Sequence, residues 1–286
     1  MTDSGGVVLI TGALGGMGSA SARALAADGT RMLLTDRDPV RLEEAAAEIS
    51  KTGVRCTTFV SELTDPNSIA RLVDAVRDHG GLKTLVHTAA LSPSMADWKS
   101  VLTVDYLGTV RLIEGLLPLA SRGTSAICFA SIAAHQGHPI SAQTVDALDD
   151  PNHPDLLDRL VAAADGEITS GAAYIWSKTA IVRQCERWAV PWGARGARIV
   201  SISPGLMDTP MGRYELEHNP RKRPLMELTP LVRARAENQS ALPGRCEDIA
   251  AAVTFLASDA ASFITGCDLR VDGGLIGALK LRAALD

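Results

Sequence analysis

The stretch V-V-L-I-T-G-A-L-G-G-M-G, residues 7–18, decides the fold class of this chain. Residues 7–10 form a short apolar run typical of a buried strand, and a cluster of glycines follows directly. Glycine lacks a Cβ, so the main chain can turn sharply and approach a ligand closely. Small residues from Gly18 to Asp28 then predict a helix that ends at Gly29. A glycine-rich turn between a strand and a helix predicts a dinucleotide site, because phosphates meet free N–H groups at the helix N-terminus.

The rest of the chain continues the alternation of strands and helices. Further strands are predicted over residues 31–35, 54–60, 84–87, 125–130, 198–203 and 269–272, with helical patterns between most of them. This order predicts a parallel sheet with helices on both faces. No break in composition marks a second domain, so residues 1–286 are predicted to form a single domain.

Composition excludes several classes of protein. Hydrophobic residues make up 46% of the 286 residues, which is enough for a large core. The net charge of −5 gives no reason to expect nucleic acid or an anionic membrane as a partner. We identify no signal peptide and no apolar run of about 20 residues, so a cytoplasmic protein is expected. The five cysteines contain no C-x-x-C pair, which favours buried free thiols and no metal site.

Asp36 follows the second predicted strand and bears on the choice of cofactor. A carboxylate at this place can bind the ribose hydroxyls of an adenosine half and would repel a 2′-phosphate, which favours NAD over NADP. Arg37 leaves NADP open, because a guanidinium there could pair with a 2′-phosphate. The carboxylate could also serve only to cap the turn.

A second signal is Y-I-W-S-K, residues 174–178. On a helix, residues four apart share a face, so Tyr174 and Lys178 are predicted to lie side by side. Tyrosine is a poor base at neutral pH, and a nearby cation favours its phenolate form. Such a pair can take a proton from an alcohol oxygen or return it. With the dinucleotide turn, it predicts hydride transfer between a nicotinamide and a carbon that bears oxygen.

Taken together, these motifs resemble those of the classical short-chain dehydrogenase/reductase family, over nearly the whole chain. The matching motifs are T-G-x-x-x-G-x-G at 11–18, Asp36, Ser131, Tyr174-x-x-x-Lys178, P-G-x-x-x-T at 204–209 and V-D-G-G at 271–274. The resemblance implies an α/β fold with a Rossmann-type, doubly wound, seven-stranded sheet. It also implies alcohol–ketone interconversion with NAD or NADP.

The resemblance also implies roles for individual residues. Tyr174 would be the general acid/base, Ser131 would orient the substrate oxygen, and Lys178 would also hold the nicotinamide ribose. The implied cofactor-binding residues are Gly12, Leu14, Gly15, Gly16, Met17, Gly18, Asp36, Arg37, Glu62, Leu63, Thr88, Ala89, Ala90, Tyr174, Lys178, Pro204, Gly205, Leu206 and Thr209.

The chain departs from the family pattern in two short segments. The family's N-N-A-G is H-T-A-A at residues 87–90, so Ala90 replaces a glycine, and we interpret His87 as a hydrogen-bonded strand-end residue. The family's asparagine, whose main-chain carbonyl supports a water-mediated proton path, is Asp105 here. We count Asp105 among the catalytic residues, because a carboxylate near Lys178 would stabilise its charge and shift the pH optimum.

A third departure is an insertion of residues from about 136 to 170, between Ser131 and Tyr174. It contains D-D-P-N-H-P-D at 149–155 and a predicted short helix over 156–164, and it resembles the 3α-hydroxysteroid dehydrogenase/carbonyl reductase branch. The insertion would cover a face beside the Tyr174 helix that many relatives use for assembly. A homodimer or a homotetramer is therefore expected.

Residues 207–240 are predicted to form a loop that covers the substrate. Met207, Met211 and Tyr214 are expected to line the pocket, together with Leu216, Leu225 and Met226. Such a pocket favours an apolar cyclic or steroid-like alcohol or ketone. The basic run at 221–223 is interpreted as a solvated loop tip. Two alternatives stay open: an NADPH-dependent carbonyl reductase and a non-catalytic nucleotide-binding regulatory protein.

Overall fold

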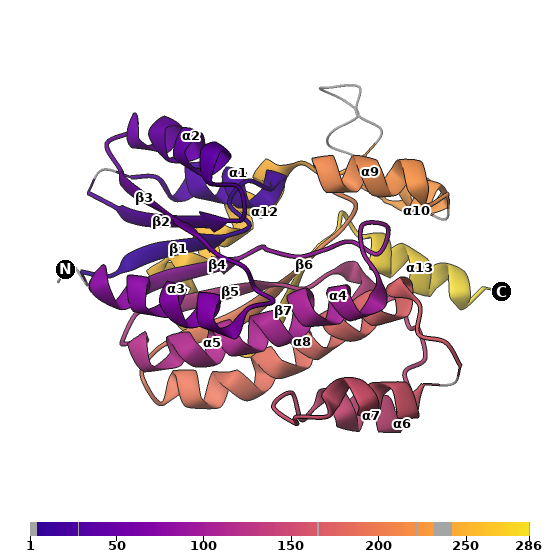
Figure 1. Cartoon of the computed structure of the whole chain (residues 1–286). Coiled ribbons are helices and arrows are strands. Elements are labelled where there is room, and N and C mark those ends of the chain that lie inside the picture. Colours follow the sequence, from indigo (N-terminus) through magenta and orange to yellow (C-terminus); the bar gives the residue numbers. More distant parts are fainter. Residues whose placement is uncertain (1–4, 28, 165, 221, 232–241, 286) are drawn as a thin grey trace.

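The computed structural model describes residues 5–27, 29–164, 166–220, 222–231 and 242–285. Within these residues, seven parallel strands form one sheet in the order β3-β2-β1-β4-β5-β6-β7 (Figure 1). The strands are β1 (Val7–Thr11), β2 (Arg31–Asp36), β3 (Arg55–Val60), β4 (Leu82–His87), β5 (Ser125–Phe129), β6 (Arg198–Pro204) and β7 (Asp268–Val271). The predicted doubly wound sheet is confirmed. Its strand order reverses between β1 and β4, and in such sheets the crevice at this point receives the ligand.

Helices cover both faces of the sheet (Figure 1). One face carries α1 (Gly16–Leu25), α2 (Pro39–Ser50) and α12 (Cys246–Ala257), and the other carries α3 (Pro66–Asp78), α4 (Trp98–Leu102), α5 (Thr109–Leu116) and α8 (Ser170–Gly193). Strands covered on both sides need apolar residues at consecutive positions, and all five residues of β1 are buried. A separate hydrophobic core lies under each layer of helices.

Polar caps determine where several helices begin. Asp38 accepts hydrogen bonds from backbone N–H groups at the start of α2, and Asp65 does so at the start of α3. In both helices the next residue is proline, whose missing N–H costs nothing in the first turn. Thr169 caps α8 in the same way, five residues before Tyr174. This cap therefore fixes the register of the helix that carries the tyrosine and the lysine.

The segment predicted as an insertion contains two helices that pack against each other (Figure 1). The helix expected over 156–164 is α7 (Leu156–Ala163), whereas α6 (Ala142–Leu148) was not predicted. Helix α6 is too short to show a clear period, and the signal we missed is its cap, Ser141, which accepts from the N–H of Thr144. Asp149, which directly follows α6, forms ion pairs with Arg183 and Arg187 of α8. These pairs hold the insertion against the helix of Tyr174.

The region predicted as a long loop is largely helical. It contains α9 (Pro210–His218) and α10 (Lys222–Leu228), while residues 221 and 232–240 of the predicted span lie outside the described residues. Thr209 caps α9, and Pro210 occupies the first helical position, which are start signals that we overlooked. Together with α13 (Leu275–Ala283), these helices lie beyond the carboxyl ends of the strands (Figure 1). In the part of the chain that is described, no helix has both the length and the apolar character needed to span a bilayer.

Candidate active site

At Gly12 and Gly18 the turn between β1 and α1 is packed too tightly for a side chain. Gly12 has a φ of +65°, and a Cβ on it would lie 2.7 Å from the backbone nitrogen of Ala89. A Cβ on Gly18 would overlap with the carbonyl oxygen of Gly12. The hydroxyl of Thr88 donates a hydrogen bond of 2.7 Å to the carbonyl of Thr11 and thereby ties the turn to the end of β4. The turn is thus a rigid cradle made of backbone.

Helix α1 begins at this cradle with its N-terminal N–H groups facing the turn. Its N-cap residue is Gly15, and no side chain of the described residues caps the helix. The first N–H groups of a helix have no partner within the helix and lie at the positive end of its dipole. An uncapped N-terminus beside a backbone cradle fits the pyrophosphate of a dinucleotide.

A cavity of about 160 Å³ lies at the carboxyl ends of β1 to β4. It brings together many of the predicted cofactor residues, namely Gly12, Gly15, Asp36, Arg37, Glu62, Leu63, Thr88, Ala89 and Ala90. Leu14, Gly16 and Gly18 do not line it; Gly18 is buried, and a Cβ on Gly16 would lie 3.0 Å from Thr209. Sequence reasoning missed Ser61, which follows β3 and whose hydroxyl lies 2.6 Å from that of Thr35. Its position directly after a strand was the available signal.

Asp36 serves the turn as well as the cavity. One carboxylate oxygen accepts a hydrogen bond of 2.8 Å from the N–H of Arg37, and the other accepts one of 3.1 Å from the N–H of Leu14. Asp36 therefore caps the turn through these two hydrogen bonds, as the alternative interpretation from the sequence allowed. Each carboxylate oxygen has a second lone pair, so the group can still accept hydroxyl donors on its cavity side.

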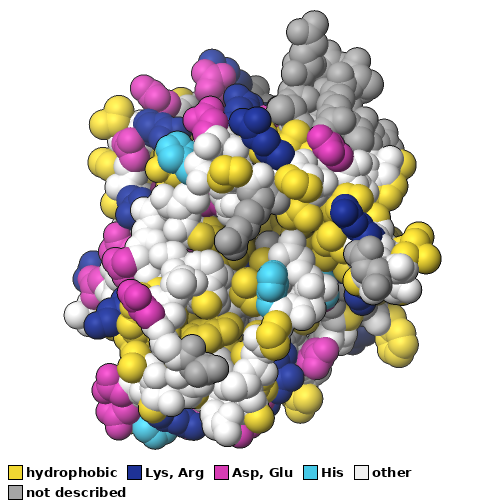
Figure 2. All heavy atoms as spheres, turned by 90° about the vertical axis from the view of Figure 1, so that its right-hand side faces the viewer, with side chains coloured by type: hydrophobic (Ala, Val, Ile, Leu, Met, Phe, Trp, Pro, Cys, Tyr) yellow, Lys and Arg dark blue, Asp and Glu magenta, His cyan; other side chains and the backbone are white. Residues whose placement is uncertain are grey.

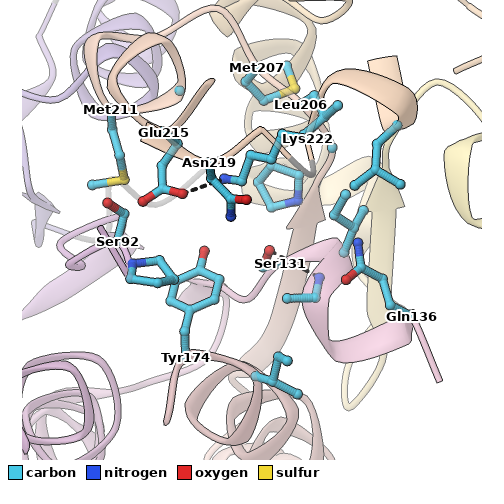
Figure 3. A pocket seen from close by; sticks show the side chains of 18 of the residues that line it. Ser92, Ser131, Gln136, Tyr174, Leu206, Met207, Met211, Glu215, Asn219 and Lys222 are labelled. Atoms are coloured by element: carbon cyan, nitrogen blue, oxygen red, sulfur yellow. Dashed lines mark hydrogen bonds and ion pairs between the residues drawn. The ribbon is translucent and has the colours of Figure 1, made fainter. Parts of the chain in front are cut away.

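A larger cavity of about 610 Å³ lies under α9 and α10. The face of the molecule at the carboxyl ends of the strands is hollowed, and hydrophobic side chains gather in its middle (Figure 2). Tyr174, from α8, and Ser131, which caps the 3₁₀ turn η3 (Ile132–His135), line this cavity with their hydroxyl groups facing it (Figure 3). The other predicted residues that line it are Met17, Pro204, Gly205, Leu206, Met207, Thr209, Met211 and Leu225. Because Met211 lines both cavities, the cavity of the predicted cofactor residues adjoins the one that the hydroxyls of Ser131 and Tyr174 face.

The structure contradicts the predictions that Tyr214, Leu216 and Met226 line the pocket, and it contradicts the solvated loop tip at Lys222. Tyr214 is 39% exposed and stacks on His218 with ring centroids 3.9 Å apart, so it lies outside the cavity. Met226 is buried in a hydrophobic cluster, against which Leu216 packs, and neither lines the cavity. Of the basic run at 221–223, Lys222 lines the cavity and is therefore not part of a solvated tip. Arg223 is exposed, and Arg221 lies outside the described residues.

Lys178 lies buried behind Tyr174. Its ammonium group is 5.4 Å from the centroid of the Tyr174 ring, 3.3 Å from the carbonyl oxygen of Phe129 and 3.1 Å from a carboxylate oxygen of Asp105. The side chains of Lys178 and Asp105 are only 4% and 0% exposed. Lys178 lines neither cavity, so the structure does not bring its side chain into the cavity of the predicted cofactor residues.

Asp105 reaches Lys178 from a π-helical turn, η1 (Thr103–Gly108), between α4 and α5. Its other carboxylate oxygen accepts from the N–H of Leu91 at 2.7 Å. Burial raises the pKa of Asp105, and Lys178 and the Leu91 N–H oppose that rise. Burial alone would lower the pKa of Lys178, but Asp105 and Tyr174 outweigh it and raise that pKa. The carboxylate therefore helps to keep the lysine charged, as expected for a residue of this type at this position.

His87 is a structural residue, as predicted. Its ring nitrogens lie 2.7 Å from the hydroxyl of Thr11 and 2.8 Å from that of Thr109. The hydroxyl of Thr109 also donates to the carbonyl of Asp105 at 2.8 Å, so the histidine ties the end of β4 to the turn of Asp105. Burial and the charge of Lys178 lower the pKa of His87 to about 3, so the ring is neutral.

Among the described residues, no group of three or more histidine, cysteine or carboxylate side chains could hold a metal ion. The five cysteines are all free, as predicted, but only Cys128 and Cys185 are buried. Cys267 is exposed, so the prediction of buried thiols is wrong there.

Comparisons with known proteins agree with this geometry. Residues 6–143 match a family model described as short chain dehydrogenase, and residues 160–276 match one described as enoyl-(acyl carrier protein) reductase. D-threitol dehydrogenase from Mycolicibacterium smegmatis is 32% identical over 280 residues, which are 94% of this chain and 92% of that protein. Galactitol 2-dehydrogenase (L-tagatose-forming) from Cereibacter sphaeroides is 27% identical, covering 94% of both chains. The solved structure of a short-chain type dehydrogenase/reductase from Mycobacterium ulcerans superposes with a TM-score of 0.72 at 27% identity, covering 94% of this chain and 89% of that one.

This chain therefore belongs to the short-chain dehydrogenase/reductase family. Members of the family are oxidoreductases that act on CH–OH groups with nicotinamide cofactors. The two cavities, the backbone cradle and the hydroxyl pair of Ser131 and Tyr174 are consistent with that class.

Proposed function

We propose that this protein interconverts a secondary alcohol and a ketone, with NAD as the cofactor and Tyr174 as the acid/base. The observation that carries the proposal is the environment of Tyr174. Its hydroxyl faces a cavity beside Ser131, and a buried ammonium group lies 5.4 Å from its ring (Figure 3). A hydroxyl in this position can exchange a proton with a substrate oxygen, and the nearby positive charge stabilises the negative charge that develops on it during the exchange.

Each side chain of the site has a distinct task in this proposal. Ser131 and Tyr174 hold the substrate oxygen by hydrogen bonds. The phenolate of Tyr174 takes the hydroxyl proton during oxidation and returns it during reduction. Lys178 stabilises the phenolate by its charge, and Asp105 keeps Lys178 protonated. When bound, the nicotinamide supplies the acceptor or the donor of the hydride.

The preference for NAD is supported by the carboxylate of Asp36 in the smaller cavity. It can accept hydrogen bonds from ribose hydroxyls and would repel a 2′-phosphate. The alternative, NADP, is supported by Arg37, whose exposed side chain lies next to Asp36. Replacing Asp36 by alanine removes both the acceptor for the ribose hydroxyls and the charge that repels a 2′-phosphate, so we expect the ratio of kcat/KM for NAD to that for NADP to fall at least tenfold, which is at least about 1.4 kcal/mol.

The larger cavity supports a cyclic substrate with a mainly apolar ring. Leu206, Met207, Ile175 and Leu225 line it, and methionine can adapt to ligands of different shape. Its volume of about 610 Å³ falls in the range of small-molecule sites.

The test is nicotinamide absorbance with NAD⁺ and NADP⁺ separately, against hydroxysteroids and cyclic alcohols, with Tyr174→Phe as the matched blank. The phenylalanine keeps the ring and loses only the hydroxyl. Turnover with NAD⁺ that disappears in the variant would support the proposal, whereas turnover only with NADP⁺ would refute the cofactor assignment. Cofactor binding without turnover of any alcohol would favour the alternative of a non-catalytic nucleotide-binding protein.

We further propose a homo-oligomer, either a dimer or a tetramer. Apolar side chains on two helices support it, because Val190 of α8 is 76% exposed and Phe255 of α12 is 44% exposed. Burial of such side chains against a second copy would stabilise an assembly. Light scattering tests this directly, and the mass of a monomer at micromolar concentration would contradict it.

A further inference from the structure

An ion pair stands in the wall of the larger cavity, away from the catalytic hydroxyls. A carboxylate oxygen of Glu215, on α9, lies 2.9 Å from the ammonium nitrogen of Lys222, on α10. Both residues line the cavity, and both face it from the side opposite Tyr174 (Figure 3). The side chain of Glu215 is 2% exposed and that of Lys222 is 28% exposed. The cavity wall also contains the polar residues Ser92, Gln136, His138 and Asn219, and this pair adds a charged donor–acceptor site to it.

The carboxylate of Glu215 is held in place and ionised. The N–H of Ser94 donates a hydrogen bond of 2.9 Å to its other oxygen. Burial alone would raise the pKa of Glu215, but Ser92, Lys222 and Ser94 outweigh it and lower that pKa. The four residues come from α9, α10 and the segment after β4, so three parts of the chain converge on this carboxylate.

A buried ion pair gains little stability, because the cost of removing both charges from water offsets their attraction. An entirely apolar substrate would worsen this cost, since it would cover both charges without offering a hydrogen bond. The best occupant is a group that accepts from the ammonium and also donates to the carboxylate. A hydroxyl group does both, a carboxylate can only accept, and an ammonium can only donate.

We propose that Glu215 and Lys222 bind a second hydroxyl group of the substrate, so that the substrate is a cyclic diol or polyol. The inference rests on the proposed function, because the first hydroxyl is the one that reacts at Tyr174. The second hydroxyl donates to Glu215 and accepts from Lys222 at the far end of the ring. The ring between the two hydroxyls contacts the apolar wall formed by Leu206 and Leu225.

A series of ring compounds tests the proposal: 4-methylcyclohexanol, cyclohexane-1,4-diol and 4-hydroxycyclohexanecarboxylate. The methyl compound matches the diol in size but lacks the second hydroxyl. We measure kcat/KM with NAD⁺ for the wild type, and dissociation constants by calorimetry for Tyr174→Phe saturated with NAD⁺. A hydrogen bond to a charged group predicts a preference for the diol over the methyl compound of about tenfold or more in both measurements.

Each of the variants Lys222→Met and Glu215→Gln removes or weakens one of the two hydrogen bonds to the second hydroxyl and should reduce this preference severalfold. The glutamine keeps an oxygen for the Ser94 N–H, which protects the fold if the lysine variant is unstable. The matched control is Lys51→Met, whose lysine caps the C-terminus of α2 and forms an exposed ion pair with Glu48, and this variant should keep the preference. A structural role alone would change melting temperature and leave the ratio between substrates unaltered.

The outcomes separate this proposal from the proposed function. A preference near one in the wild type, a preference retained in Lys222→Met, or a preference for the acid over the diol overturns the hydroxyl site. A calorimetric preference for the diol without any turnover supports the hydroxyl site and refutes the oxidoreductase. Turnover without a preference for the diol supports the oxidoreductase and refutes the hydroxyl site. If no ring compound is bound and none is turned over, both proposals are refuted.

Discussion

Replacing Lys178 by methionine would leave a buried carboxylate without its counter-ion, and the structure sets the size of the effect. Asp105 and Lys178 are 3.1 Å apart and almost fully buried. At an effective dielectric constant of about 20, two unit charges at this distance attract each other by about 5 kcal/mol. Breaking a buried pair by removing one partner costs about 3 to 5 kcal/mol. We therefore expect Lys178→Met to lower the free energy of unfolding by about 3 kcal/mol at pH 7.5, apart from its loss of activity.

The loss should depend on pH in a defined direction. In the variant, burial still raises the pKa of Asp105, and of the opposing groups only the Leu91 N–H remains. The folded state then holds a proton at pH values where the unfolded chain, with a carboxyl pKa of about 3.9, has released it. By linkage, the free energy of unfolding falls as pH rises through this window, so the deficit of the variant is larger at pH 8 than at pH 5.

The assay is urea unfolding at pH 5, 6.5 and 8, at one protein concentration, with Asp105→Asn/Lys178→Met as the rescue. The asparagine is neutral and retains an oxygen for the N–H of Leu91, so the double variant should be more stable than Lys178→Met at pH 8. A loss below 1 kcal/mol, about the size of the uncertainty of the method, would refute the buried pair. So would a deficit that is the same at every pH, or a double variant no more stable than the single one.

Three further predictions address the pH profile, the cofactor cradle and the insertion. Asp105→Asn should move the whole pH profile of kcat/KM for alcohol oxidation to lower pH. Asp105 no longer raises the pKa of Lys178, so the lysine loses its proton at a lower pH, and below that pH its uncompensated charge favours the phenolate. An unchanged profile would contradict this role of Asp105. Gly18→Ala should weaken NADH binding at least tenfold in a fluorescence titration, a cost of at least about 1.4 kcal/mol, because the added methyl group overlaps with the carbonyl oxygen of Gly12. The control Gly193→Ala adds a methyl group in open space and should bind NADH as the wild type does. The pKa of Asp149 is lowered chiefly by Arg183, so the ionised carboxylate stabilises the insertion at pH values above the carboxyl pKa of the unfolded chain, and this effect is lost as pH falls through the pKa of the folded state. Asp149→Asn at pH 7 should therefore speed amide hydrogen exchange in α6. Equal exchange rates in the variant and the wild type would refute this role of Asp149.

The local sequence was sufficient for the frame of the molecule and for placing Tyr174 and Lys178 on one face of a helix. Runs of apolar residues placed the central strands, because a strand covered on both faces requires them at consecutive positions, whereas the edge strands β3 and β7 contain polar residues and are only partly buried. The glycines of the turn and the spacing of Tyr174 and Lys178 predicted features that depend only on backbone freedom and on the helical period. Such features are encoded by neighbours in the chain, and the structure agrees with them.

Features that depend on where distant segments meet were decided only by the tertiary structure. On α9 the sequence favoured Tyr214 as the pocket residue, but the orientation of the helix turns Glu215 inward and leaves Tyr214 exposed. The partner of Glu215, Lys222, looked like part of a solvated basic run until α10 placed it against the cavity. The sequence by itself determined the strands, the glycine turn and the catalytic spacing, because these follow from local period and sterics. Packing between elements decided the polar wall of the cavity and the buried support of Lys178, because side-chain direction and burial arise only when remote parts of the chain come into contact.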